Sequence, residues 1–248
     1  MNEESKKELT ISIDGKETHV SLDRQKEILN AHSHGETSWR VFKIIGEFVN
    51  GFEFLEKYGK SVSFFGSARQ GFDSYIYREA YELARDMAKL GYVVFTGGGP
   101  GVMEAANKGA AELGEGKSVG ININLGDGTG PTERKNQYVE ESAGFDFFFV
   151  RKVILSFSSQ IYIFFPGGFG TMDELFEMLT LIQTKKTAPI PVILVGKEYW
   201  EPLLEWIRTT MYEKNSAINK EDMDMFTLVD SSEEALEFIK TCVLNGKE

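Results

Sequence analysis

The stretch Ile161-Tyr-Ile-Phe-Phe-Pro-Gly-Gly-Phe-Gly-Thr-Met-Asp-Glu174 joins a short apolar run to a glycine-rich turn and then to a helical pattern. A second stretch, Tyr92-Val-Val-Phe-Thr-Gly-Gly-Gly-Pro-Gly-Val-Met-Glu104, has the same order. Glycine lets the backbone turn sharply and approach a ligand closely, and the following helix directs unpaired N–H groups into the same space. Each stretch therefore predicts a strand, a tight turn and a helix whose N-terminus favours an anion such as phosphate.

Outward from these two stretches, short apolar runs alternate with helical patterns. We expect strands at 61–65, 92–96, 118–124, 145–149, 161–165, 191–195 and 226–230, and helices at 76–90, 101–113, 151–159, 172–184, 199–213 and 231–242. Near-continuous apolar strands that alternate with helices are typical of a parallel sheet covered on both faces. The sequence thus predicts an α/β, Rossmann-like fold: a doubly wound, mainly parallel sheet of about seven strands with helices on both faces.

The first residues differ from the rest of the chain. Residues 1–36 are polar and contain all three histidines, and residues 9–13 and 18–22 alternate apolar and polar side chains around Asp14-Gly15. We expect an N-terminal extension, residues 1–36, with a possible β-hairpin. Residues 37–248 should form a single nucleotide-binding domain that begins with an amphipathic helix near 38–58. For His32 and His34, solvated loop positions are favoured over a metal site.

The composition restricts the function classes. The 248 residues carry a formal charge of −11, which would repel a nucleic acid. The single cysteine, Cys242, excludes an internal disulfide and suits a reducing compartment. The first residues lack the apolar segment of a secretory signal, and no apolar run approaches the ~20 residues of a membrane span. We expect a cytoplasmic protein that binds neither nucleic acid nor membrane.

Two glycine-rich turns in one sheet indicate phosphate binding more strongly than one, because tight turns between strand and helix need glycine in any case. Thr171 also fits a helix N-cap with Glu174 three residues later, so a capping box is the simpler alternative. An NAD site requires an acidic residue about 20 positions after the turn, but the strand after Gly97–Gly101 ends in Ile121-Asn-Ile-Asn124. The GxxxxGK[ST] sequence of a P-loop is also missing, so a mononucleotide is the natural ligand.

Charged residues occur where the expected strands end. Arg151 and Lys152 open a predicted helix, where a basic pair is unfavourable for the helix dipole unless an anion is present. A surface pair is the alternative interpretation. Glu174 is expected in the first turn of its helix, close to the sugar if the preceding loop holds a phosphate. Glu133 follows the third strand on the same side of the sheet, whereas its neighbours Arg134 and Lys135 are expected in solvent.

These motifs resemble the Lonely Guy (LOG) family of nucleoside 5′-monophosphate phosphoribohydrolases, many of which carry the historical label "possible lysine decarboxylase". The family pattern PGGxGTxxE is present as Pro166–Glu174, and it follows a GGGxGxM-like turn, Gly97–Met103, and the pair Arg151-Lys152. The resemblance covers residues 60–213, and the segment 131–138 is similar to the longer bacterial branch. Short plant-type members have Met-x-x-Arg-Lys where this chain has Phe148-Phe-Val-Arg-Lys152, which leaves the preferred base open.

The resemblance implies that Arg151 and Glu174 are the catalytic pair. It also implies that the protein needs neither a cofactor nor a metal. It further implies a homodimer or larger homo-oligomer. The implied reaction hydrolyses the N-glycosidic bond of a nucleoside 5′-monophosphate, AMP-like or a cytokinin riboside monophosphate, to free base and ribose 5-phosphate. The residues implied to bind the nucleotide or its phosphate are Gly98, Gly99, Glu133, Lys152, Gly168, Phe169, Gly170, Thr171 and Thr180.

In this reaction a carboxylate stabilises the positive charge that develops on the anomeric carbon. We assign that part to Glu174 and expect Arg151 and the helix dipole to keep it ionised. A non-catalytic nucleotide or molybdenum-cofactor carrier on the same fold is the main alternative. A lysine decarboxylase would need a pyridoxal-bearing lysine, which nothing in the sequence marks, and a dinucleotide oxidoreductase is disfavoured by the missing acidic residue.

Overall fold

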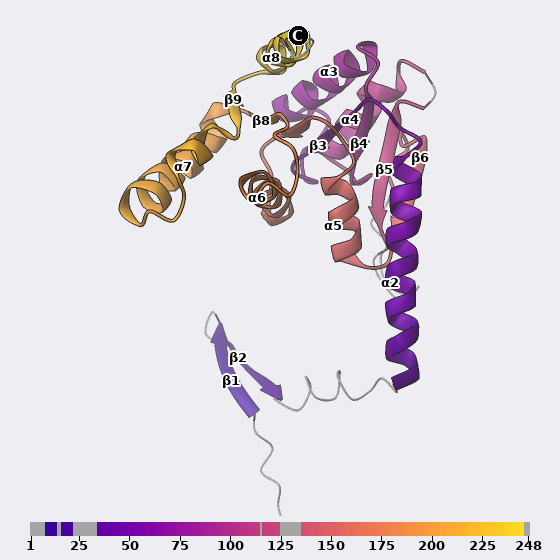
Figure 1. The fold of residues 1–248 in the computed structure, drawn as a ribbon, viewed down its shortest axis with the longest axis vertical. Helices are drawn as coiled ribbons and strands as arrows, with labels where there is room; N and C mark the ends of the chain where they lie inside the picture. Colours follow the sequence, from indigo (N-terminus) through magenta and orange to yellow (C-terminus); the bar gives the residue numbers. More distant parts are fainter. Residues whose placement is uncertain (1–7, 14–15, 22–33, 115, 125–134, 246–248) are drawn as a thin grey trace, which may run out of the picture. The chain divides into compact units, whose positions relative to one another are not determined.

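The computed structural model describes residues 8–13, 16–21, 34–114, 116–124 and 135–245. Contacts divide the chain into two compact units, Met1–Glu47 and Phe48–Glu248. In the first unit, β1 (Glu8–Ile13) and β2 (Lys16–Ser21) pair antiparallel (Figure 1). Asp14, Gly15 and His32 lie outside the described residues. The helix α2 (His34–Leu55) continues from the first unit into the second.

The second unit is built on a parallel sheet of seven strands in the order β6-β5-β4-β3-β7-β8-β9. Each neighbouring pair of strands is parallel, with Val62 opposite Val94 and Phe64 opposite Ile163 around the central strand. This arrangement confirms the predicted fold class. The strands are β3 (Ser61–Phe65), β4 (Val93–Thr96), β5 (Ser118–Ile123), β6 (Glu141–Phe145), β7 (Tyr162–Phe164), β8 (Val192–Val195) and β9 (Thr227–Val229).

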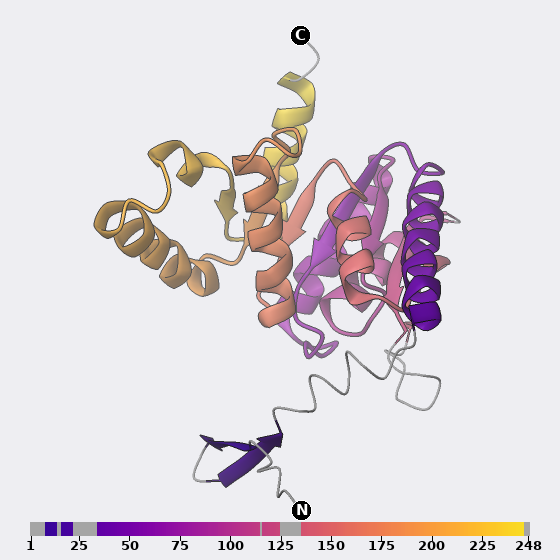
Figure 2. The same cartoon turned by 60° about the horizontal axis from the view of Figure 1, so that its bottom comes forward.

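Helices cover both faces of the sheet. Apolar residues of α3 (Tyr75–Lys89), α4 (Val102–Ala111) and α8 (Ser232–Asn245) form one buried core with strand residues such as Phe64 and Val94. Figure 2 shows α5 (Phe148–Ser156) and α6 (Phe169–Gln183) on the face opposite α3 and α4. Beyond β8, α7 (Lys197–Trp206) continues into a π-helical segment, Ile207–Lys214, and a short 3-10 helix, Lys220–Asp224. Within the described ranges, no helix has the length and apolar character needed to cross a lipid bilayer.

The strand predicted at 145–149 is wrong. The strand β6 ends at Phe145, and α5 begins at Phe148. A short apolar run fits a buried strand and a helix equally well, and here Phe148 and Phe149 are half exposed whereas Val150 is buried. The true strand, Glu141–Phe145, lies at the sheet edge and is mostly exposed, so it carries little apolar signal.

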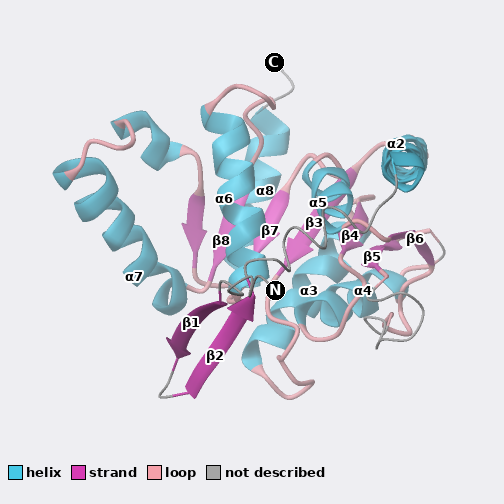
Figure 3. Ribbon diagram, turned by 90° about the horizontal axis from the view of Figure 1, so that it is seen from below, coloured by secondary structure: helices cyan, strands magenta, loops and turns pink. Residues whose placement is uncertain are grey.

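The order of the strands determines where a ligand can bind. From β3 the chain adds β4, β5 and β6 on one side, and it then returns to add β7, β8 and β9 on the other. The strands β3 and β7 therefore lie side by side at the point where the order reverses (Figure 3). In open α/β sheets, ligands bind in the crevice beyond the carboxyl ends of the strands at this switch point.

Candidate active site

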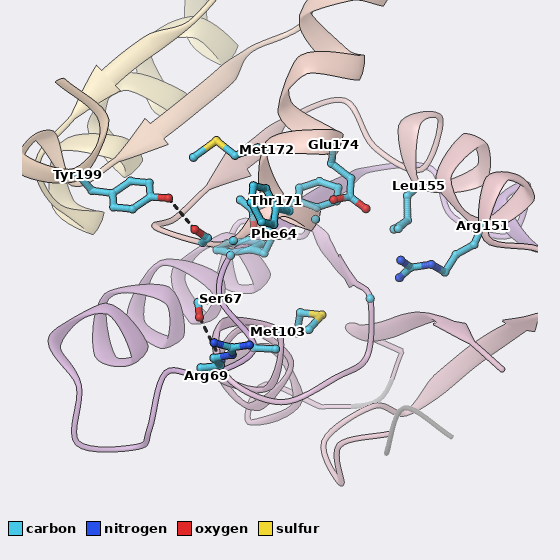
Figure 4. A pocket seen from close by; sticks show the side chains of 18 residues that line it. Phe64, Ser67, Arg69, Met103, Arg151, Leu155, Thr171, Met172, Glu174 and Tyr199 are labelled. Atoms are coloured by element: carbon cyan, nitrogen blue, oxygen red, sulfur yellow. Dashed lines mark hydrogen bonds between the residues drawn. The ribbon is translucent and has the colours of Figure 1, made fainter. Parts of the chain in front are cut away.

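A cavity of about 710 Å³ lies at the carboxyl ends of β3 and β7, at the switch point. The loop Gly66–Arg69 after β3 and the turn Gly167–Thr171 after β7 form two of its walls. The other walls include Gly97 of the turn after β4, Arg151 of α5, Glu174 of α6 and Tyr199 of α7 (Figure 4). Its volume is within the range of small-molecule sites.

The N-terminus of α6 opens into this cavity. The helix begins at Phe169 after Gly168, and its first intrahelical hydrogen bond runs from Met172 N to Gly168 O, at 3.1 Å. The amides of Phe169, Gly170 and Thr171 precede that bond, as at any helix start. The N-cap predicted at Thr171 is wrong, because this buried residue lies inside the first turn. The turn must be tight, since a Cβ on Gly167 would collide with Thr171 Oγ1.

The other glycine-rich turn has a different role. Gly98 adopts a φ of 74°, and its amide donates to Thr96 Oγ1 at 2.8 Å. Asn136 Nδ2 donates to the carbonyls of Gly98 and Gly99 at 3.1 and 2.9 Å. Neither Gly98 nor Gly99 is among the residues that line the cavity, whereas Gly97 is.

The start of α4 is also occupied, because Val102 N donates to Ser67 O of the β3–α3 loop at 3.0 Å. The turn after β4 therefore fixes the β3–α3 loop in place. The turn after β7 instead presents its helix start to the cavity.

Arg151 and Glu174 face one another across the cavity (Figure 4). Both side chains are buried, with exposed fractions of 8% and 7%. The Arg151 guanidinium lies over the ring of Phe148, at 4.7 Å from the ring centre, and its Nε has no hydrogen-bond partner. Among the described residues, no ion pair or hydrogen bond joins Arg151 to Glu174. The pair thus leaves room between its charged ends for a ligand.

The charge state expected for Glu174 needs correction. Burial raises the pKa of the Glu174 carboxyl to about 7, well above its ordinary value of 4.5. Arg151 acts in the opposite direction but only partly offsets the burial, and the nearby Asp173 carboxylate raises the pKa further. Glu174 also lies in the second turn of α6 rather than the first, because the helix begins at Phe169. A carboxyl that titrates near neutral pH is suited to accept or donate a proton.

Two further predicted residues, Lys152 and Thr180, do not line the cavity. Lys152 Nζ contacts Asp173 Oδ1 of α6 at 2.6 Å. Thr180 is exposed, and its hydroxyl donates to Phe176 O at 2.7 Å. Glu133 falls in the range 125–134, which the structure does not describe. By contrast, Gly168, Phe169, Gly170 and Thr171 all line the cavity.

The residues that the sequence did not single out are on the β3–α3 loop and on α7. Ser67 and Arg69 line the cavity, and Arg69 adds a second guanidinium to its lining. The Tyr199 hydroxyl donates to Gly167 O at 2.6 Å and so supports the turn after β7. The β3–α3 loop could have been identified as part of the site by its position after the central strand. The sequence, however, does not reveal which strand is central.

Comparisons with known proteins identify a matching family and several relatives of this chain. The family described as "Possible lysine decarboxylase" matches residues 103–239. An uncharacterized protein of Archaeoglobus fulgidus is 33% identical over 133 residues, which cover 52% of this chain and 81% of that protein. A protein of Oryza sativa subsp. japonica, described as "Probable cytokinin riboside 5'-monophosphate phosphoribohydrolase LOGL5", is 29% identical over 136 residues. That match covers 54% of this chain and 53% of the rice protein, so it spans about half of the relative.

Solved structures share the fold at lower identity. The molybdenum cofactor binding protein of Rippkaea orientalis has a TM-score of 0.54 and 24% identity, over 75% of this chain and 98% of that one. The molybdenum cofactor carrier protein of Chlamydomonas reinhardtii has a TM-score of 0.54 and 22% identity, over 75% and 99% of the two chains. These likenesses show the fold alone. Because the family match covers more than half of the chain, the protein belongs to the family described as "Possible lysine decarboxylase", the LOG family.

Proposed function

We propose that the protein hydrolyses the N-glycosidic bond of a nucleoside 5′-monophosphate and releases the free base and ribose 5-phosphate. The observation that carries this proposal is the buried, unbridged pair of Arg151 and Glu174 in a cavity that also contains an open helix N-terminus. The family and the rice relative support the same reaction class. A buried guanidinium without an anionic partner is costly, so a ligand that brings negative charge fits this cavity.

The phosphate would bind at the start of α6. The amides of Gly170 and Thr171 and the positive end of the helix dipole favour an anion there. Arg69 lines the same cavity from the β3–α3 loop and can contribute a charge-assisted hydrogen bond to a phosphate oxygen. The binding energy of the phosphate would then fix the ribose against Glu174.

At the sugar, the bond between C1′ and the base nitrogen breaks, and its electron pair leaves with the base. Glu174, in its ionised form, stabilises the positive charge on C1′ and accepts a proton from the water that adds to this carbon. Arg151 donates a hydrogen bond to the departing base, which takes up a proton from solvent. A pKa of about 7 leaves a large fraction of Glu174 ionised at neutral pH.

The reaction is tested with a panel of nucleoside 5′-monophosphates, including AMP and a cytokinin riboside monophosphate, with the matching nucleosides as controls. We expect free base and ribose 5-phosphate from at least one monophosphate and much slower cleavage of the nucleoside. Equal turnover of AMP and adenosine would contradict the phosphate anchor. Retention of a nucleotide or of a phosphorylated pterin without any product would instead indicate a carrier, as the titles of the structural neighbours describe for those proteins.

We also propose a homodimer or larger homo-oligomer. Phe169 is 97% exposed, and Phe148 and Phe149 are 50% exposed on the neighbouring helix start. Large apolar side chains at this exposure are typical of surfaces that pack against a partner. Light scattering after size exclusion tests this proposal, and a monomer at micromolar concentration would contradict it.

A further inference from the structure

We propose that Lys152 is a positioning residue, which ties α5 to α6 through Asp173 and Glu177 and thereby holds Arg151 opposite Glu174. The proposal rests on the proposed function in one respect, namely that Arg151 and Glu174 are the reacting pair. In this proposal Lys152 has a structural role, whereas the family resemblance implies that it contacts the nucleotide.

Each of the two helices contributes two consecutive charged residues to this region. Arg151 and Lys152 follow each other on α5, and Asp173 and Glu174 follow each other on α6. Consecutive residues of a helix point in different directions, so one member of each pair enters the cavity and the other lies beside it. Arg151 and Glu174 line the cavity, whereas Lys152 Nζ lies 2.6 Å from Asp173 Oδ1.

A third residue completes the contact. Glu177 Oε2 lies 3.4 Å from Lys152 Nζ, and Glu177 follows Asp173 by one helical turn on the same side of α6. Lys152 and Glu177 side chains are 22% and 21% exposed, whereas the Asp173 side chain is 47% exposed. We call these three residues the interhelical clamp. Burial lowers the pKa of Lys152, but the hydrogen bond to Asp173 and the charge of Glu177 outweigh it and raise the pKa overall, so the ammonium stays charged.

The first half of α5 is less uniformly buried than the second, although Val150 is buried. Phe148 and Phe149 are half exposed, whereas Ile154 and Leu155 in the second half are fully buried. Within the part of the chain that the structure describes, Arg151 itself forms no ion pair that would hold it in place. Among the described residues, the clamp supplies the ion pairs between this end of α5 and α6. A shift there would move the guanidinium relative to the Glu174 carboxyl, and misplacement by about 1 Å can cost about 100-fold in rate.

The clamp also balances charge beside Glu174. Asp173 raises the pKa of Glu174, while Arg151 and, more weakly, Lys152 lower it. Arg69 lines the same cavity from the β3–α3 loop. Removing Lys152 should therefore raise the pKa of Glu174, and removing the charge of Asp173 should lower it. The effect of losing the clamp can thus be separated from the effect of the changed charge. Both substitutions weaken the clamp, but they shift the pKa of Glu174 in opposite directions.

The experiment compares Lys152→Ala, Lys152→Arg and Asp173→Asn with wild type, using hydrolysis of AMP across pH 5–9. We expect Lys152→Ala to lower kcat by about 10- to 100-fold with KM changed less than about threefold. We expect Lys152→Arg to recover most of kcat. Asp173→Asn should also lower kcat, and the acidic limb of its pH profile should move to lower pH, whereas that of Lys152→Ala moves to higher pH. Lys89→Ala is the matched control, because it breaks a 2.6 Å pair with Asp86 on α3, away from the cavity.

The contrary results are clear. A higher KM for Lys152→Ala with unchanged kcat would show that Lys152 binds the nucleotide directly, and unchanged kinetics would show that the clamp is dispensable. If the wild type hydrolyses no monophosphate, the proposed function fails, but the clamp is still tested by the NMR signal of the Arg151 Nε–H group. A shift of this signal in both Lys152→Ala and Asp173→Asn, with none in Lys89→Ala, would support the clamp. An unchanged Arg151 signal in both variants would overturn it.

Discussion

Replacing Glu174 by Gln should stabilise the ligand-free protein at pH 8 and leave its stability nearly unchanged at pH 4. The carboxyl is 7% exposed, and burial raises its pKa from the ordinary value of 4.5 to about 7. The folded protein therefore holds the proton more tightly than the unfolded chain does. Below pH 4.5 the carboxyl is neutral in both states, and stability is lost as the pH rises from 4.5 to about 7.

The size of the effect follows from the two pKa values. Each pH unit between them corresponds to about 1.4 kcal/mol, so an ionised Glu174 costs about 3 kcal/mol of unfolding free energy above pH 7. Gln has the same shape and carries no charge, so Glu174→Gln should be more stable than wild type by about 3 kcal/mol at pH 8.

Urea unfolding followed by tryptophan fluorescence at pH 4, 6 and 8 measures this difference. The control is Glu53→Gln, whose side chain is exposed on α2, and it should change stability little at any of these pH values. If Glu174→Gln differed from wild type by the same amount at pH 4 and pH 8, burial would not control the ionisation of Glu174.

Three other predictions concern activity and folding. The value of kcat/KM for AMP should rise with pH through a midpoint near 7, because Glu174 must be ionised to accept a proton. This midpoint lies above the pKa of about 6 of a substrate phosphate. A value of kcat/KM independent of pH from 5 to 8 would exclude this role of Glu174. Arg69→Ala should raise KM for AMP about tenfold and leave adenosine unaffected in steady-state assays, whereas the same change at Arg78, on α3 and outside the cavity lining, should alter neither. Gly167→Ala should destabilise the fold by about 1–3 kcal/mol in urea unfolding, because a methyl group there collides with the next helical turn, and Gly59→Ala, which has open space, should have little effect.

Much of the fold was accessible from the sequence because its signals are local. Glycine-rich turns after apolar runs identified the starts of α4 and α6, and the alternation of runs and helices identified a parallel sheet. The motifs that contain Arg151 and Glu174 also pointed to one shared site, and both residues line the same cavity. Where the run Phe145–Val150 combined a strand end with a helix start, apolar character alone could not separate the two.

Features that depend on tertiary packing were not accessible. The importance of the loop Gly66–Arg69 follows from strand order, which sequence periodicity does not contain. The charge state of Glu174 depends on how deeply packing buries it, and burial outweighs the opposing effect of Arg151. The contacts of Lys152 depend on the distance between α5 and α6, which only the structure shows.

The most direct test of the central claim is a time course of adenine and ribose 5-phosphate formation from AMP by wild type and Glu174→Gln, with AMP affinity measured in parallel by calorimetry. We predict equal amounts of both products from wild type, and AMP binding of similar affinity without measurable products from Glu174→Gln. Product formation by Glu174→Gln at the wild-type rate would contradict the account.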